Sequence, residues 1–180
     1  MKHDSSLTAR LAAVLAAGLA AGLALAGTAL AVQPASGTAA SGTSASAAAC
    51  IARNLYVVKG RLEGAAGNRY LTVKMTNVGD ADCSAGIATR AVFRDFAGPL
   101  GVPSAVSSGS GLVTLAPGQT VRSVVHWTDP GPVPPGQCQQ ASATLVAFRV
   151  PSLHHTWRLP LTADVCTTVQ YRPDTTPLKS

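Results

Sequence analysis

The stretch Asn68–Cys83 reads NRYLTVKMTNVGDADC and decides the fold of the chain. Its apolar residues Leu71, Val73 and Met75 alternate with polar ones, which is the two-residue period of a β-strand with one buried and one exposed face. The segment Asn77–Asp80 then supplies side chains that accept hydrogen bonds from nearby backbone amides and a glycine that tolerates positive φ. The stretch therefore predicts a strand, a tight turn and a cysteine.

The first residues have the organisation of a secretory signal peptide. Lys2 and Arg10 flank a short polar opening, and the segment Leu11–Ala26 that follows contains only Ala, Leu, Gly and Val. The sequence ALA at 29–31 is the small-x-small pattern that signal peptidase reads, so we expect residues 1–31 to be removed and the protein to be exported. An uncleaved membrane anchor is the alternative, because the apolar run is long enough to span a bilayer.

Composition divides the remainder into three parts. Residues 32–49 consist almost entirely of Ala, Ser, Gly and Thr, and we expect a disordered linker because they cannot bury enough apolar surface to offset the entropy of ordering. Residues 50–171 suit one domain with one core. Residues 172–180, which contain two prolines, are expected to form a flexible tail.

The cysteines Cys50, Cys83, Cys138 and Cys166 all lie in the exported part, so we expect two disulfides. Pairing Cys50 with Cys83 and Cys138 with Cys166 is favoured, because each pair would enclose one hairpin-like segment. A long-range pairing, such as Cys50 with Cys138, is the alternative. Zinc binding is disfavoured, since no two cysteines have the short spacing of a metal knuckle.

Further segments with the strand period follow along the domain, separated by turn signals such as Pro117-Gly118. The other expected strands are Leu55–Leu62, Ile87–Phe96, Leu112–Leu115, Thr120–Trp127, Ser142–Val150, His154–Leu161 and Val165–Tyr171. No segment after the signal has the spacing of an amphipathic helix. The expected fold class is therefore all-β, an immunoglobulin-like β-sandwich of roughly seven or eight strands with two disulfides. Trp127 or Trp157 is expected to be the large core residue.

Several landmarks of this domain resemble those of a known family. They are Cys50, GNRYL at 67–71, the Thr76-Asn77-x-Gly79 turn, Cys83, Leu115-x-Pro117-Gly118, Trp127, Cys138, Phe148-x-Val150-Pro151 and Cys166. Their order from Cys50 to Tyr171 is similar to that of a domain of unknown function, the DUF4232 type, found in exported actinobacterial proteins. The resemblance implies the fold and the export, and it implies no catalytic residue.

The net charge of +6 raises the question of an anionic partner. The basic residues are spread over the expected strands with little aromatic interleaving, so nucleic-acid binding is not expected. Arg90 and Arg94, which share one face of a strand, come nearest to a patch. An ordinary solvated surface is the default interpretation, and attraction to anionic wall polymers or lipid headgroups is the alternative.

No catalytic, cofactor or metal site is expected. Copper would need His and Met ligands, but the adjacent His154 and His155 would point to opposite faces of a strand, and Met75 fits the core. Gly109-Ser110-Gly111 lacks the pattern of a nucleophile elbow. Glu63 is the only glutamate, so paired carboxylates are scarce. We therefore expect that the protein is not an enzyme.

Two functional classes remain. The first is an exported non-catalytic binding or structural module of the cell envelope, whose loops Gly98–Gly111 and Asp129–Gln137 would contact an unknown protein or an anionic cell-wall polymer. The second is a secreted protease inhibitor that offers a rigid loop to an active site. The expected location is secreted or extracytoplasmic and associated with the cell wall, with membrane attachment only if the signal segment is kept.

Overall fold

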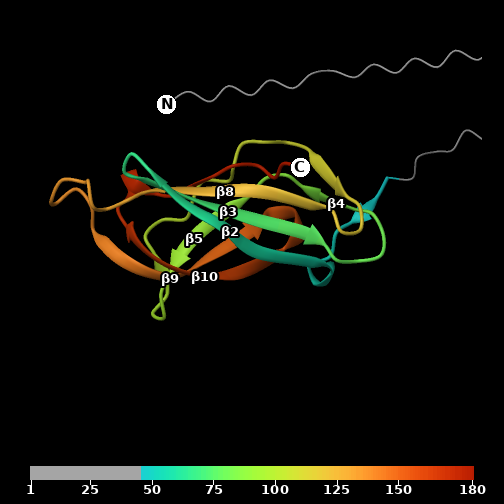
Figure 1. Ribbon diagram of the computed structural model, residues 1–180, viewed down its shortest axis with the longest axis horizontal. Helices are drawn as coiled ribbons and strands as arrows, with labels where there is room; N and C mark the ends of the chain where they lie inside the picture. Colours follow the sequence, from blue (N-terminus) through green and yellow to red (C-terminus); the bar gives the residue numbers. More distant parts are fainter. Residues whose placement is uncertain (1–45) are drawn as a thin grey trace, which may run out of the picture. The chain divides into compact units, whose positions relative to one another are not determined.

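The computed structural model describes residues 46–180 (Figure 1). The predicted signal peptide, 1–31, and most of the predicted linker lie outside the described residues. The strands are β1 (Ala48–Ala49), β2 (Leu55–Ala65), β3 (Asn68–Asn77), β4 (Cys83–Gly86), β5 (Arg90–Arg94), β6 (Pro99–Leu100), β7 (Leu112–Leu115), β8 (Thr120–Thr128), β9 (Gln140–Val150), β10 (His155–Cys166) and β11 (Asp174–Thr175). Three 3₁₀ turns accompany them, η1 (Ala52–Asn54), η2 (Pro151–Leu153) and η3 (Val169–Tyr171). The predicted all-β class is confirmed.

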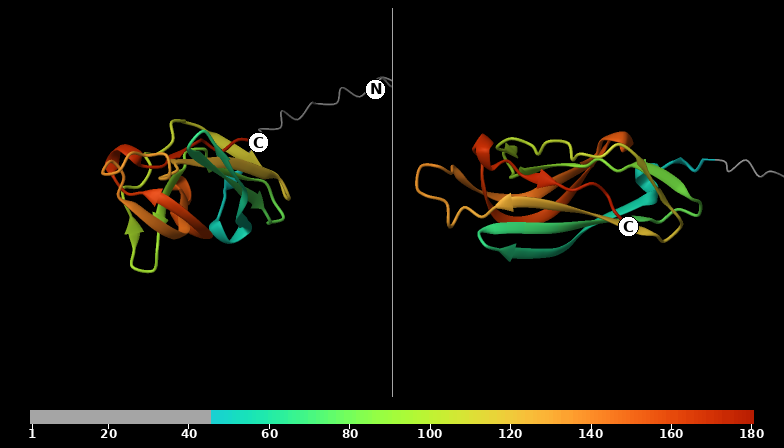
Figure 2. Two further views of the ribbon diagram at one scale, coloured as in Figure 1. Left: turned by 60° about the vertical axis from the view of Figure 1, so that its left-hand side comes forward. Right: turned by 90° about the horizontal axis from the view of Figure 1, so that it is seen from above.

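Two four-stranded sheets form the body of the domain and face each other (Figure 2). The β3 sheet has the order β11-β8-β3-β2, and the β9 sheet has the order β10-β9-β5-β6. A third sheet, β1-β4-β7, lies beside them at one end (Figure 1). The immunoglobulin-like strand order remains a prediction. Within residues 46–180, no helical segment has the length and apolarity needed to cross a bilayer.

The alternating pattern of β3 directs its apolar residues into the space between the sheets. Leu71 and Met75 are fully buried, which confirms the predicted inward face and the core position of Met75. Across the core, Trp127 of β8 packs edge-to-face on Phe93 of β5, with the ring centroids 5.0 Å apart. Such a pair contributes about 0.5–1.5 kcal/mol beyond the apolar area that it buries. Trp127, and not the partly buried Trp157, is therefore the aromatic residue that joins the two sheets.

The turn after β3 is closed by Asn77, which is 1 % exposed. Its Oδ1 accepts a hydrogen bond from the amide of Gly79 at 2.9 Å. Its Nδ2 donates to the carbonyl oxygens of Ala81 at 2.8 Å and Leu115 at 2.9 Å. The predicted self-capping turn is present, and the bond to Leu115 also ties it to β7. Asn77 thus fixes the point at which the chain leaves the β3 sheet.

Two disulfides are present, as expected. They join Cys50 to Cys83 and Cys138 to Cys166, which is the favoured connectivity. The first attaches the start of the domain to β4, and the second closes the open end of the β9–β10 hairpin. No free cysteine occurs in the described part of the chain. Two disulfides suggest an oxidising environment outside the cytoplasm.

The last part of the β9 sheet contains one strand where the sequence predicts two. The prediction of two separate strands, His154–Leu161 and Val165–Tyr171, is wrong, because β10 is one unbroken strand, His155–Cys166. A shift in register between Pro160 and Ala163 lets the strand continue past the proline. Since β10 lies at the edge of its sheet, a residue without a backbone donor is tolerated there.

The flexible tail predicted for 172–180 is also wrong, because this segment is part of the fold. Asp174–Thr175 pair with β8, Leu178 is 3 % exposed, and Lys179 exchanges two backbone hydrogen bonds with Arg122. The segment lies along the edge of the β3 sheet, where its prolines interrupt no pairing. Strand β1 likewise lies within the predicted linker, so the ordered domain begins before its first cysteine.

Candidate ligand-binding surface

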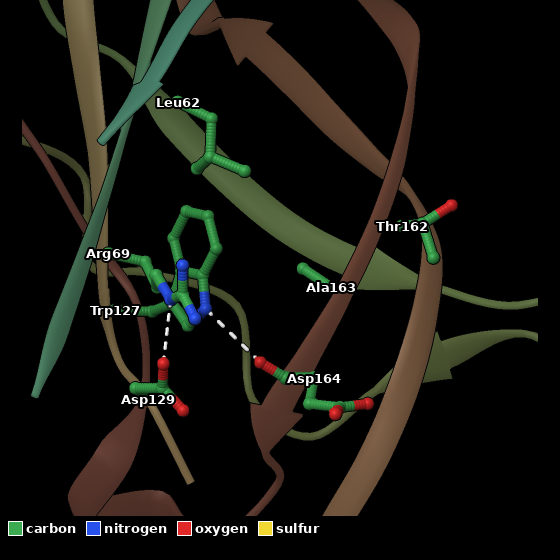
Figure 3. A pocket seen from close by; sticks show the side chains of 7 residues that line it. All are labelled: Leu62, Arg69, Trp127, Asp129, Thr162, Ala163 and Asp164. Atoms are coloured by element: carbon green, nitrogen blue, oxygen red, sulfur yellow. Dashed lines mark hydrogen bonds and ion pairs between the residues drawn. The ribbon is translucent and has the colours of Figure 1, made fainter. Parts of the chain in front are cut away.

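The first candidate site is a pocket of about 280 Å³ at the seam between the two sheets, which we call the seam pocket (Figure 3). It lies where β2 shifts register between Lys59 and Leu62 and β10 shifts between Pro160 and Ala163. Such shifts bend a strand away from regular pairing and leave space beside it. The lining residues are Leu62, Arg69, Trp127, Asp129, Thr162, Ala163 and Asp164.

The polar groups of the seam pocket bond to one another. Arg69 donates through Nε to Asp129 Oδ2 at 2.6 Å, and the indole N–H of Trp127 donates to the backbone carbonyl of Asp164 at 3.3 Å (Figure 3). A hydrogen bond from the amide of Gly131, followed by that from Arg69, holds the pKa of the Asp129 carboxyl below its usual value. Because these groups already have hydrogen-bond partners within the chain, we assign the seam pocket a structural role in joining the sheets.

The second candidate is the outer face of the β9 sheet, where four arginines gather; we call it the arginine face. They are Arg90 and Arg94 of β5, Arg149 of β9 and Arg158 of β10. The register places Arg90 directly opposite Arg149, and Arg158 opposite Ala147, two residues away along β9. The predicted pair on one strand face is therefore part of a larger cluster that spans three neighbouring strands.

A hollow of about 290 Å³ lies in the arginine face. Val92 and Ala147, which pair across β5 and β9, give it an uncharged floor. The rest of its lining consists of Arg90, Ala91, Arg94, Pro103, Arg149 and Thr156. The hollow thus combines a cationic rim with an apolar floor, which suits a ligand that carries an anionic group on an uncharged body.

The four arginines have no ion-pair partner among residues 46–180. The ion pairs there join Arg61 to Glu63, Arg69 to Asp129 and His126 to Asp174. Like charges directly opposite each other destabilise a sheet, so the Arg90–Arg149 pair has a cost unless an anion lies between them. Guanidinium groups bind phosphate and carboxylate through paired hydrogen bonds. The arginine face therefore presents guanidinium groups that are able to pair with phosphate or carboxylate.

The loop after β6 supports the arginine face. The buried Ser104 donates its amide to the Ala91 carbonyl at 2.8 Å and accepts the Ala91 amide on Oγ at 2.9 Å. Ser107 makes the same two bonds with Thr89, at 2.9 and 2.8 Å. The carbonyl of Ser104 also accepts Nε of Arg90 at 3.0 Å. The loop therefore fixes both the edge of β5 and one arginine of the cluster.

The β5–β6 hairpin projects from the body of the domain (Figure 2). It carries an exposed aromatic ring. The sequence predicts a strand through Phe96, but β5 ends at Arg94 and Phe96 is 98 % exposed. The turn itself is ordered, because Asp95 Oδ1 accepts the amides of Ala97 and Gly98, each at 2.8 Å. The hairpin thus holds an apolar ring in solvent two residues beyond Arg94.

A second row of cations lies on the outer face of the β3 sheet. Lys74 of β3 stands opposite Arg122 of β8, which in turn stands opposite Lys179. These residues also have no ion-pair partner in the described part of the chain. Two of the three are lysines, which attract anions as point charges instead of through a planar fork. This row is therefore a charge-matched comparison for tests of the arginine face.

The histidines considered as copper ligands have other roles. His126 bonds through Nε2 to Asn68 Oδ1 at 2.9 Å. His154 ends η2 with a left-handed φ of 50°, so it does not lie in a strand as expected, and His155 packs edge-on against Trp157. Within residues 46–180, no three side chains of the metal-ligating types lie together. That the protein has no physiological metal stays a prediction.

Sequence reasoning located half of the arginine face and missed Arg149 and Arg158. The signal for Arg149 was its place between Phe148 and Val150, which predicts an outward side chain in a strand whose neighbours face the core. The sequence does not show, however, that β9 lies between β5 and β10. The cluster becomes visible only with the order of the strands.

Comparison with known proteins gives a family and no characterised relative. Neither the curated proteins nor the solved structures contain a match to this chain. A family model does match, over residues 50–178, and its description is a domain of unknown function, DUF4232. This range contains both disulfides and all four residues of the arginine face. The chain therefore belongs to the DUF4232 family, as its cysteines, turns and Trp127 suggested.

Proposed function

We propose that the protein is an exported, non-catalytic binding module of the cell envelope, and that its arginine face binds an anionic cell-wall polymer. The observation that carries the proposal is the hollow in which Arg90, Arg94 and Arg149, none with an ion-pair partner among residues 46–180, surround the apolar floor of Val92 and Ala147. Planar guanidinium groups around such a floor suit an anionic group on an uncharged body.

Export is supported by the two disulfides, since such bonds persist in oxidising compartments. The leader expected from the sequence agrees with this location. The absence of catalysis is supported by the seam pocket, where Asp129 is paired with Arg69 at 2.6 Å and Asp164 accepts a hydrogen bond from Ser142 Oγ at 2.8 Å. A general acid or base needs a group that is available for proton transfer to a substrate.

The test is binding of the purified exported chain to isolated cell walls. We expect Arg90→Ala/Arg149→Ala to weaken binding about tenfold or more, because two charge-assisted contacts are lost. Lys74→Ala/Arg122→Ala removes the same charge from the opposite face and should change the affinity less than about threefold. Walls stripped of their phosphate- and carboxylate-bearing polymers should no longer bind the protein.

Two outcomes would contradict the proposal. Equal losses in the two double variants would mean that only net charge matters. Unchanged binding after removal of the anionic polymers would point to another partner, such as an envelope protein. Near-native melting temperatures for both variants would show that altered binding does not reflect unfolding.

The secreted protease inhibitor remains the second candidate. Its presenting segment would be the loop Asp129–Gln137. That loop folds back through successive turns, in which the Val133 amide donates to Pro130 and the Gln137 amide donates to Pro134, at 3.0 and 3.2 Å. An inhibitor that fills a protease cleft presents an extended segment, so we rank this function below polymer binding. Stoichiometric inhibition of a protease by the purified domain would reverse the order.

A further inference from the structure

The arginine face and the exposed tip of the β5–β6 hairpin follow one another along the chain. Arg90, Val92 and Arg94 occupy alternate positions on the outer side of the strand, and Phe96 follows two residues later at the hairpin tip. At about 3.3 Å per residue, Arg90 and Arg94 lie about 13 Å apart along β5, and Phe96 lies beyond them in the turn. Such a length exceeds one phosphate group or one sugar ring and suits several units of a chain.

We propose that this surface is a binding track for a linear anionic sugar polymer. The inference rests on the proposed function and specifies its ligand. Arg90, Arg149 and Arg94 bind the phosphate or carboxylate groups of successive units. The floor formed by Val92 and Ala147 contacts the uncharged part of a unit, and Phe96 packs against a sugar ring.

Phe96 is the residue that distinguishes a sugar chain from a simple anion. Its ring is 98 % exposed, yet the turn that carries it is fixed by the Asp95 side chain and by the Asp95 amide, which donates to Gly98 O at 3.0 Å. An ordered turn loses little further entropy when a ligand binds. The negative face of an aromatic ring attracts the polarised C–H bonds on one side of a sugar.

The geometry favours a sugar polymer over the other polyanions that reach an exported protein. Single-stranded nucleic acid is held by several aromatic side chains on which successive bases stack, and this surface has one exposed ring. A bilayer is broad and flat, whereas the arginines surround a hollow of about 290 Å³. A chain that lies along β5 can fill the hollow and reach the hairpin at the same time.

The test uses the exported chain and defined oligomers of two kinds, galacturonate for carboxylate and phosphodiester-linked mannose for phosphate. Each is offered as a single unit, a dimer, a tetramer and an octamer, and binding is measured by calorimetry. We expect the affinity for one of the two series to rise about tenfold or more from the single unit to the tetramer, because linked contacts raise the effective concentration. The octamer should add little, since the track is then full.

The variants separate the parts of the track. Phe96→Ala should lower tetramer affinity about tenfold and leave inorganic phosphate binding unchanged, since the ring contacts only the sugar. Arg90→Ala/Arg149→Ala should weaken both ligands, and Lys74→Ala/Arg122→Ala should weaken neither by more than about threefold. Phe96 is exposed, so its replacement should leave the melting temperature unchanged.

The outcomes distinguish this inference from the proposed function. Wall binding that depends on the arginines, with no effect of chain length or of Phe96→Ala, would overturn the track and leave the proposed function standing. Wall binding that ignores the arginines would overturn both. Tighter binding to vesicles rich in phosphatidylglycerol than to either oligomer series, lost in Phe96→Ala, would overturn the track in favour of a lipid surface.

Discussion

Replacing Asn77 by alanine tests whether its side chain closes the turn after β3 and ties it to β7. The change removes three side-chain hydrogen bonds, to the Gly79 amide and to the carbonyls of Ala81 and Leu115. At about 0.5–1.5 kcal/mol for each bond, the loss is about 3 kcal/mol, and the buried carbonyl of Leu115 is left without this donor. A domain with about 5–15 kcal/mol of stability should remain folded at room temperature.

The assay is urea unfolding with the disulfides intact, followed by the fluorescence of the buried Trp127. The matched control is Asn68→Ala, at the other end of the same strand, where a half-buried asparagine bonds to Ala66 and His126. Water can replace those bonds, so the control should lose less than about 1 kcal/mol. A loss for Asn77→Ala of the same size as the control would refute the structural role that we assign to the turn.

Three further variants test the Cys138–Cys166 disulfide, the core between the sheets and the ion pair of the seam pocket. Replacing Cys138 and Cys166 together by alanine should cost about 3.6 kcal/mol in the chain-entropy model for a separation of 28 residues, read from the shift of the urea midpoint. Trp127→Ala should cost about 3–5 kcal/mol, because it leaves a cavity between the sheets, and its urea unfolding is followed by circular dichroism since the variant lacks the fluorescent ring used as the probe. The lowered pKa of Asp129 means that its charged form stabilises the fold above its usual pKa of 3.8, and that this contribution is lost as the pH falls through the lower folded value. Melting temperatures of Asp129→Asn should therefore fall less steeply with acid than those of the unmodified protein.

The features that the sequence predicts correctly are those encoded over short distances. Strand β3 follows from the alternation of its residues, and the turn at Asn77 follows from the hydrogen-bonding capacity of its own side chain. The two disulfides follow in the same way, because each joins cysteines that flank neighbouring segments of chain. Each inference needs no knowledge of which strands lie side by side.

The errors arise where a local signal competes with sheet pairing. The expected strand runs on to Phe96, but the Asp95 side chain bonds to the next amides and ends the strand first. Pro160 looks like a strand terminator, yet an edge position and a register shift accommodate it. The segment after Arg172 has the composition of a tail, but the free edge of β8 pairs with it. In the last two cases the pairing with a neighbouring strand determines the outcome.

For the proposed polymer binding, the long loop after β6 has a different role from the one that its sequence predicts. The sequence predicts an exposed loop that would present a ligand-binding surface, whereas Ser104 and Ser107 fasten it to β5. Its carbonyl at Ser104 orients Arg90, so the loop acts through the arginine face that it supports. On the proposed function, shortening the loop would therefore weaken polymer binding even if no loop residue touched the polymer. Single substitutions of the arginines, compared with substitutions of the cation row on the β3 sheet, show which residues contact the polymer. Deleting the loop cannot show this, because it also removes the residues that hold Arg90 in place.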